Sequence, residues 1–169
     1  MAVYTFKRKA ARVVVLDGQG RVLLLRTRDP ADPAKEPWWE IPGGGMESHE
    51  TSADAARREL LEETGIVDVE MGPCVWVQHA TFSFGGFAFD QDEWIHVAWS
   101  DGEDVRATGH EALEALAFHD LRWWPLDELI ASTEPLLPAR LRELLPPLIA
   151  GELPHPPLDI GGGDALVGG

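Results

Sequence analysis

The sequence predicts a single domain of mixed α and β structure. Runs rich in β-branched, leucine and aromatic residues, which favour strands, lie on both sides of a segment with helical spacing. Hydrophobic residues make up 44% and charged residues 25% of a 169-residue chain, which suits one well-buried soluble domain. We place this domain at residues 1–150 and treat residues 151–169, rich in proline and glycine, as a C-terminal extension.

The first two strands predicted form a hairpin. The runs RVVVLD and RVLLLRT are apolar and are separated by GQG, a glycine turn. Three more strand-like runs follow further along the chain, and LRWW predicts another short strand. The three runs are CVWVQHA, FSFGGFAFD and EWIHVAWS.

A helix is predicted over residues 51–64. Thr51 can cap its start together with Asp54, and Gly65 supplies the permissive residue at its end. An apolar stripe faces the core at roughly 100° per residue. The stripe consists of Ala53, Ala56 and Leu60.

Two further helices are predicted towards the end of the domain. PLDELIAS has Pro125 in its first turn, a position that tolerates proline. PARLRELLPPLIAG follows, and we expect Pro146 and Pro147 to interrupt it.

Charge and cysteine content narrow the function classes. A formal net charge of -15 argues against non-selective binding to nucleic acid or anionic membranes. No apolar run approaches the roughly 20 residues needed to span a bilayer, so we expect a cytoplasmic protein with no membrane partner. The single cysteine, Cys74, cannot form an internal disulfide, and its apolar neighbours favour a packed residue over a nucleophile.

Three glutamates share one face of the predicted helix. Glu59, Glu62 and Glu63 are spaced i, i+3 and i+4, with Arg58 beside Glu62. Near the negative end of the helix dipole each is unfavourable by about 0.3 to 1 kcal/mol. A solvated helix face is the simplest interpretation, but a local rule broken without compensation more often marks a functional site. A divalent cation such as magnesium, which favours carboxylate oxygens, would turn the repulsion into a binding site.

Three consecutive glycines, residues 43–45, precede this helix. They lie between a strand-like WEI and the capped helix, where close approach of the backbone to a ligand is favoured over a flexible linker. No lysine follows in the Walker pattern, so the sequence does not support an ATPase phosphate loop.

The stretch from the glycines to the end of the helix resembles the signature of the Nudix hydrolase family. WEIPGGG is similar to the usual entry into this signature, whereas His49 stands where relatives commonly have glycine. The residues that match, at the family's spacing, are Gly44, Glu50, Arg58, Glu59, Leu60, Glu62, Glu63, Gly65 and Ile66.

The resemblance implies an α/β/α sandwich with a mixed sheet and hydrolysis of a nucleoside diphosphate linked to another group. It implies Mg²⁺ or Mn²⁺ as the cofactor, with Glu59, Glu62 and Glu63 as metal ligands. The main-chain carbonyl of Gly43 or Gly44 would complete this site. The remaining signature residues, Arg58 and Glu50, would orient the glutamates and brace the loop.

The proton acceptor of such a reaction is not fixed by the signature. We favour Glu114, with Glu111 next, because relatives often place this group in the turn before a strand such as LRWW. Asp92 and Glu93 are the rival candidates.

Substrate choice is not specified by the sequence. Markers of relatives that act on ADP-ribose, dinucleotides or coenzyme A are absent. We expect a small nucleotide-type substrate, as the resemblance implies, and do not assign which nucleotide derivative it is. Homo-oligomerisation also stays open. Aromatic residues could stack on a base, but in strands they are more often core, so no substrate-binding residue is assigned. These residues are Trp38, Phe82, Phe84 and Phe87.

Two alternative functions belong to other classes. A non-catalytic nucleotide-binding regulatory module of the same family would usually have an eroded signature, whereas this one is complete. An isomerase resembling isopentenyl diphosphate isomerase would need a cysteine upstream of the signature, and Cys74 lies downstream.

Overall fold

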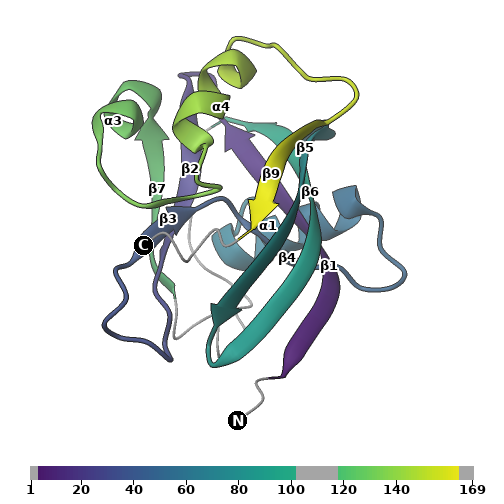
Figure 1. Ribbon diagram of the computed structural model, residues 1–169. Helices are drawn as coiled ribbons and strands as arrows, with labels where there is room; N and C mark the ends of the chain where they lie inside the picture. The colour runs from purple at the N-terminus through teal and green to yellow at the C-terminus, as the bar shows by residue number, and fades with distance from the viewer. Residues whose placement is uncertain (1–3, 102–117, 164–169) are drawn as a thin grey trace.

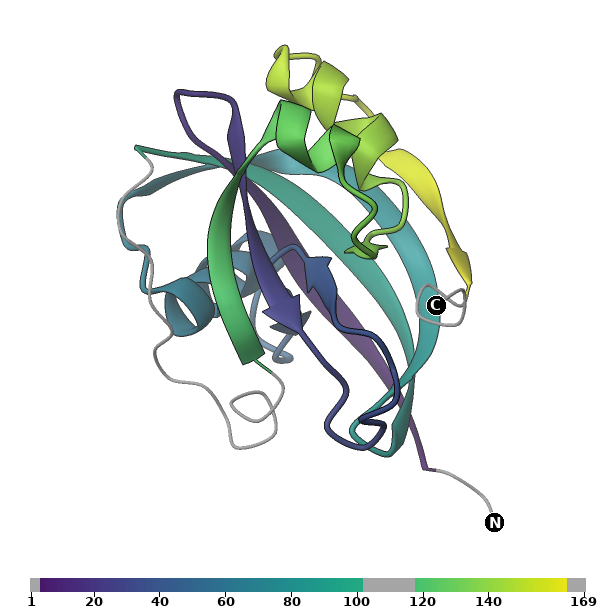
Figure 2. The same cartoon turned by 90° about the vertical axis from the view of Figure 1, so that its left-hand side faces the viewer.

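The computed structural model describes residues 4–101 and 118–163. A curled mixed sheet lies between helix α1 on one side and helices α3 and α4 on the other (Figures 1 and 2). The predicted α/β/α arrangement is therefore confirmed. The elements are β1 (Thr5–Leu16), β2 (Arg21–Thr27), β3 (Trp38–Glu40), β4 (Gly43–Gly45), α1 (Ser52–Thr64), β5 (Val69–Phe84), β6 (Phe87–Ser100), β7 (Phe118–Pro125), α3 (Leu126–Ala131), β8 (Leu136–Leu137), α4 (Leu141–Ile149) and β9 (Leu158–Gly163).

The sheet has the strand order β8-β3-β2-β1-β6-β5-β9, with β4 paired to β1 and β7 paired to β2. The pairs β1–β6, β3–β8 and β5–β9 are parallel, and the others are antiparallel. The predicted hairpin of β1 and β2 is present, with Leu16 opposite Val22 and Gly20 at a φ of +71°.

The two faces of β1 supply two hydrophobic cores, because successive side chains of a strand point to opposite faces. Val13 and Val15 pack under α1, whereas Val14 and Leu16 face α3 and α4. On α1, Ala55 joins Ala56 and Leu60 in the buried stripe, and the predicted member Ala53 is only half-buried. Both cores end where β1 becomes exposed towards Thr5.

The prediction of three separate strands between residues 74 and 100 was wrong. The runs belong to two long strands, β5 and β6, joined by Gly85 and Gly86 at φ values of +62° and +86°. The polar residues at positions 90–93 continue β6 because β1 and β5 pair with it on both sides. Tertiary pairing thus overrides weak local propensity.

The predicted interruption of the last helix was also wrong. Helix α4 continues through Pro146 and Pro147. Backbone hydrogen bonds from Leu144 to Arg140 and from Ala150 to Pro146 hold the helix on either side of the prolines, and four leucines anchor it in the core. Pro125 precedes α3 as its N-cap and does not lie in its first turn.

Part of the C-terminal extension pairs with the sheet. Strand β9 runs parallel to β5, and Ile160 is buried in the core beneath α4. The domain boundary at residue 150 stays a prediction. None of the helices in the described residues is long and apolar enough to cross a membrane.

Candidate active site

Helix α1 is fixed at both ends by the residues that predicted it. Asp54 N donates to Thr51 Oγ1 at 3.2 Å, and Thr51 N donates to Asp54 Oδ2 at 3.4 Å. Gly65 ends the helix at a φ of +77° and donates its N–H to Leu61 O. These caps fix where α1 begins and ends, and the packing of Ala55, Ala56 and Leu60 on the sheet sets which face of the helix is buried.

Two of the three glutamates are buried against β4. Glu59 and Glu63 are only 5% and 9% exposed. Gly43 N donates to Glu63 Oε1 at 2.8 Å, and an added Cβ at Gly44 would lie 2.6 Å from Glu59 Oε1. Glycine at position 44 therefore lets the Glu59 carboxylate approach the main chain closely, whereas Glu63 is held by a main-chain N–H.

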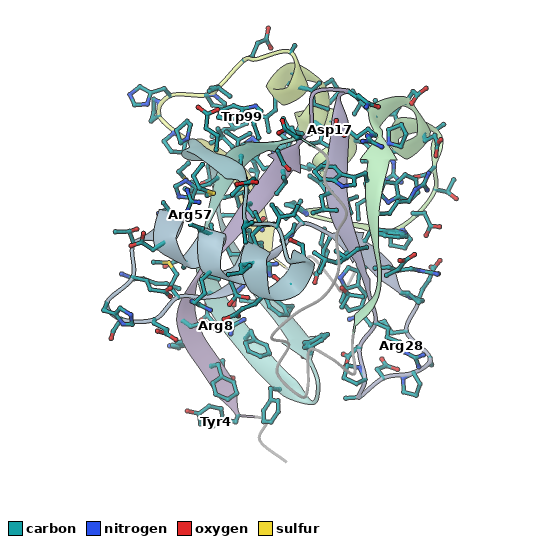
Figure 3. The ribbon with its side chains drawn as sticks, turned by 180° about the vertical axis from the view of Figure 1, so that it is seen from behind. Tyr4, Arg8, Asp17, Arg28, Arg57 and Trp99 are labelled. Atoms are coloured by element: carbon teal, nitrogen blue, oxygen red, sulfur yellow. The ribbon has the colours of Figure 1, made fainter. Side chains whose placement is uncertain are left out.

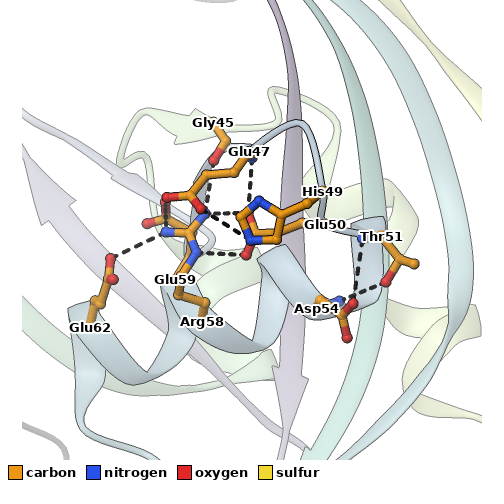
Figure 4. Close-up of polar contacts among 9 residues, drawn as sticks. All are labelled: Gly45, Glu47, His49, Glu50, Thr51, Asp54, Arg58, Glu59 and Glu62. Atoms are coloured by element: carbon orange, nitrogen blue, oxygen red, sulfur yellow. Dashed lines mark hydrogen bonds and ion pairs between the residues drawn. The ribbon is translucent and has the colours of Figure 1, made fainter.

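Arg58 links the glutamates to the loop that precedes the helix (Figure 4). Its Nη1 lies 3.1 Å from Glu59 Oε1 and 3.5 Å from Glu62 Oε2, so one cation joins both carboxylates. Its Nε and Nη2 donate to the two oxygens of Glu50 at 2.7 and 2.8 Å. Nη2 also donates to Gly45 O at 3.1 Å. These contacts join Arg58 to Glu50 and to the loop, and the supporting roles of the two residues stay a prediction.

The arginine fork sets the ionisation of Glu50. Hydrogen bonds from Arg58, above all, lower the pKa of Glu50 from an ordinary 4.5 to about 2. The same contact raises the pKa of Arg58, so the pair is ionised under ordinary conditions.

We expect Glu50→Gln to remove a pH-dependent part of the stability. A carboxyl group whose pKa is lowered on folding stabilises the fold fully above its unfolded pKa, and this stabilisation is lost as pH falls towards the folded pKa. The contribution of Glu50 should thus fade as pH falls from 4.5 towards about 2. Urea unfolding at about pH 6 and about pH 3.5 should show a smaller difference in the free energy of unfolding between parent and variant at the lower pH. A difference that stays constant would contradict the assignment.

A buried polar network lies beside this site, and most of it was missed by sequence reasoning. Arg12 Nε donates to Glu93 Oε1 at 2.9 Å, and the amide nitrogens of Gln78 and Gln91 donate to Glu93 at 2.9 and 2.5 Å. Glu93 is 3% exposed. The one signal in the sequence is polar residues two apart, at positions 91 and 93, which place both side chains on one face of a strand.

Opposing effects set the charges in this network. Burial disfavours the ionised form of Glu93, but Arg12 and the two glutamine amides outweigh it and lower the pKa of Glu93 below its ordinary value. Burial likewise opposes the charged form of Arg12, but Glu93, then Glu40 and Glu63, raise the pKa of Arg12. Arg12 thus connects the network electrostatically to Glu63 of the candidate site.

The proposed proton acceptors have different positions. Glu114 and Glu111 lie outside the described residues. Asp92 is exposed on the face of β6 opposite Glu93, where its Oδ1 lies 2.8 Å from His79 Nδ1. Glu93 already accepts from three side chains. Cys74 is half-buried, and burial raises the pKa of its thiol, which suits a packed residue.

The residues present fit a divalent cation by their chemistry and by the space at β4. Within residues 4–101 and 118–163, no three acidic, histidine or cysteine side chains lie ready to hold a metal ion as they stand. Arg58, however, holds Glu59 and Glu62 around one positive charge, and the glycine at position 44 leaves room for a carboxylate against the main chain. Carboxylate and carbonyl oxygens are the ligands that hard cations prefer.

The fold and this acidic helix next to a glycine strand define a Nudix-type hydrolase. The chain belongs to the Nudix family, because the NUDIX domain matches residues 6–148. Proteins of this family hydrolyse phosphoanhydride bonds of nucleotide-type small molecules and typically depend on divalent metals.

Individual relatives agree with this assignment. The chain is 30% identical over 133 residues to the uncharacterized Nudix hydrolase YfcD of Escherichia coli, covering 69% of this chain and 74% of YfcD. It is 46% identical over 59 residues to an RNA pyrophosphohydrolase of Dinoroseobacter shibae, covering 35% of this chain and 34% of that protein. The chain thus spans about a third of the length of that relative. The structure resembles E. coli dihydroneopterin triphosphate pyrophosphohydrolase with a TM-score of 0.61 at 18% identity, covering 89% and 99% of the two chains.

Proposed function

We propose that the protein is a metal-dependent pyrophosphohydrolase that cleaves the diphosphate linkage of a nucleoside diphosphate derivative by attack of water at phosphorus. The observation that carries this proposal is the position of Glu59 and Glu63 against Gly44 and Gly43, with Glu62 joined to Glu59 through Arg58. A complete family signature in this geometry favours catalysis over nucleotide binding alone.

Each side chain of the candidate site has a separate task in this proposal. Glu59, Glu62 and Glu63, with the carbonyl of Gly43 or Gly44, would hold Mg²⁺ or Mn²⁺. An ion held there would supply neutralisation of the charge on the diphosphate and activation of water.

The second layer of the site keeps the ligands in place. Arg58 orients the carboxylates of Glu59 and Glu62, and Glu50 fixes Arg58 through two hydrogen bonds. The N–H of Gly43 donates a hydrogen bond to Glu63 and so holds this side chain against β4. We propose Glu114 as the proton acceptor, since Glu93 is engaged with Arg12 and two glutamines.

Small nucleotides are the proposed substrates, with no requirement for a nucleic acid or membrane partner. The net charge of -15 supports this choice, because a long phosphate backbone is attracted by basic surfaces. The similarity to an RNA pyrophosphohydrolase covers only 35% of this chain, so it supports the shared chemistry and not the RNA substrate. We also propose a cytoplasmic location.

A divalent metal ion should stabilise the fold and be required for hydrolysis. Because a ligand that binds only the folded state stabilises it by mass action, Mg²⁺ at a hundred times its Kd should add about 2.7 kcal/mol. Thermal melts with and without Mg²⁺ or Mn²⁺ measure this shift. A panel of nucleoside triphosphates, ADP-ribose, sugar nucleotides and dinucleotides, with phosphate detection, measures turnover. No shift at millimolar metal together with no turnover would refute the proposed function.

A further inference from the structure

The first residues of β1 pair with the sheet on one side only. Strand β6 runs beside β1 along its whole length. On the other side, β4 reaches only as far as Ala10, and the next residue of that segment, Met46, donates its N–H to Lys9 O at 2.8 Å. Among the described residues, no strand pairs with Thr5–Arg8 on this second side. We call the segment Thr5–Arg8, with its open side, the β1 edge.

The β1 edge presents main-chain groups on its open side. Tyr4 O accepts a hydrogen bond from Ala88 N at 3.2 Å, so the even-numbered residues of β1 direct their N–H and C=O groups towards β6. Because these directions alternate along a strand, Thr5 and Lys7 direct theirs to the open side, as Lys9 directs its carbonyl to Met46. A row of such groups at the side of a sheet is a template for a further strand.

One face of the β1 edge is aromatic. Phe6 contacts Tyr4 and Phe87 edge to face, with ring centroids 4.6 and 5.5 Å apart. Tyr4 is 67% exposed, Phe6 38% and Phe87 42%, and they are three of the nine large exposed apolar side chains in the described residues. Figure 3 shows Tyr4 at the start of β1, where the strand extends beyond α1. Apolar side chains that gather on a surface often mark a site of interaction.

The opposite face of the β1 edge is basic. Lys7 and Lys9 alternate with the aromatic residues and therefore lie on the α1 side of the sheet. Their neighbours in β6, Asp90 and Asp92, are already engaged with His79, at 2.7 Å from Nε2 and 2.8 Å from Nδ1. The hydrogen bond to Asp92, above all, raises the pKa of His79, which offsets part of this negative charge. Among the described residues, neither lysine has an ion-pair partner.

The two faces together narrow the kind of partner that fits. A lysine on an edge strand often serves to prevent aggregation, which explains Lys7 but not an aromatic patch on the other face. A second copy of the chain is a poor partner, because two-fold pairing of the β1 edges brings Lys7 and Lys9 of both copies onto one face, and like charges on neighbouring strands are destabilising. A strand with acidic side chains on one face and apolar side chains on the other complements both faces.

We propose that the β1 edge binds an extended segment of another protein, in which acidic and apolar residues alternate, by adding it to the sheet as an antiparallel strand. The residue opposite Lys7 forms the main-chain hydrogen bonds and carries its carboxylate on the lysine face. Its neighbours place apolar side chains against Phe6 and Tyr4. The net charge of -15 opposes any acidic partner, but charges beyond about 8 Å are screened at physiological salt, so the local lysines decide. This surface is independent of the proposed function.

A labelled peptide of alternating valine and glutamate, about eight residues long like a typical edge strand, tests the β1 edge by fluorescence anisotropy. We expect it to bind about tenfold more tightly than the same peptide with lysine in place of glutamate, as two or three cross-strand ion pairs predict. Raising the salt concentration to about 1 M should remove most of this difference. Equal affinity for the two peptides, or no binding of the glutamate peptide at about 1 mM, would overturn the proposal.

Methylation of the peptide backbone distinguishes strand addition from attraction between charges alone. In the proposed register the glutamates direct their N–H groups at β1, and the valines direct theirs away from it. Methyl groups on the glutamate nitrogens should therefore abolish binding, whereas methyl groups on the valine nitrogens should largely preserve it. Loss of binding in both peptides, or in neither, would contradict strand addition.

Two pairs of variants assign the binding to this edge. Lys7→Glu should weaken the glutamate peptide by about tenfold and strengthen the lysine peptide, because it reverses the cross-strand charge pairs. Arg57→Glu makes the same change of charge on the exposed face of α1 and should alter neither affinity. Tyr4→Ser should weaken both peptides through their valines, whereas Leu61→Ser, also at an exposed apolar residue, should weaken neither. All four side chains are exposed, so melting temperatures should change little.

Other outcomes identify other occupants or leave the proposed function untouched. Self-association in sedimentation experiments that Tyr4→Ser abolishes would mean that a second copy occupies the β1 edge, and it would overturn the acidic partner. Unchanged peptide affinity in Lys7→Glu or Tyr4→Ser would overturn the site. A protein that hydrolyses nucleotides but does not bind the glutamate peptide refutes only the β1 edge. A protein that binds the peptide in the expected way but hydrolyses none of the nucleotide panel refutes only the proposed function.

Discussion

Glu63→Gln is expected to lower the maximal rate of hydrolysis by about 10² or more, the scale for removing one key catalytic interaction. The glutamine keeps an oxygen that can accept the hydrogen bond from Gly43 N, now 2.8 Å from Glu63 Oε1. It loses only the negative charge that a divalent cation needs. Steady-state kinetics on the best substrate of the panel, with the metal concentration varied, provides the measurement.

The fold of this variant should remain intact. Removing one of three neighbouring carboxylates relieves repulsion on α1, so the melting temperature in the absence of metal should not fall. Glu70→Gln is the matched control, because Glu70 is exposed on β5 and its loss changes the net charge equally. A Glu63 variant with near-parental kcat would exclude this carboxylate from the reaction. If Glu63→Gln lowers kcat but also unfolds the protein, Glu62→Gln repeats the test at a side chain that is more exposed.

Local signals made helix α1 predictable in detail. The cap residues Thr51 and Asp54 and the terminal Gly65 act within a few positions of the helix ends, so the sequence contains the whole reason for them. The glutamate trio is also a local pattern, because its geometry follows from the helical repeat. The same holds for the β1–β2 hairpin around Gly20.

Long-range pairing explains what the sequence did not reveal. Arg12 and Glu93 are 81 residues apart, and only the parallel pairing of β1 with β6 brings them together. The polar middle of β6 interrupts the hydrophobic pattern from which strands are predicted, yet partners on both sides keep it extended. Strand β9 likewise forms on the edge that β5 offers, in a segment whose composition predicts no regular structure.

The three consecutive glycines, residues 43–45, illustrate both what the local sequence predicts and what it misses. Their position before the helix predicted close approach of the backbone to a ligand, and the structure shows first a close approach to protein. Gly44 meets the Glu59 carboxylate, whereas Gly43 meets the backbone of β1 at Ala11 and Arg12. Neither contact follows from sequence spacing, because one depends on how α1 packs and the other on the β1–β4 pairing.

Gly44→Ala is therefore expected to lower the rate by about 10², the effect of misplacing a reacting group by about 1 Å. The new Cβ would lie 2.6 Å from Glu59 Oε1 and 2.8 Å from its Cδ, so the carboxylate must move. The obstruction is the end of a side chain and not backbone, so the fold should survive. Kinetics, together with the metal-induced shift in melting temperature, should show both activity and metal affinity reduced.

Two other glycines give controls of opposite kind. Gly43→Ala would place Cβ 2.5 Å from Ala11 O and 2.7 Å from Arg12 Cα, at a φ of +155°, and should destabilise the whole fold by about 1 to 3 kcal/mol. Gly18→Ala, in the β1–β2 turn, meets no atom within 4 Å and should change neither activity nor stability.

A double-variant cycle decides whether Gly44 acts through Glu59. In a Glu59→Ala background the carboxylate is gone, so Gly44→Ala should have little further effect on the residual rate, and the two changes should be strongly non-additive. Equal fold losses in both backgrounds would mean that the alanine methyl group disturbs something other than Glu59. In that case the closeness of Gly44 to this carboxylate would be a packing contact and not part of the catalytic geometry.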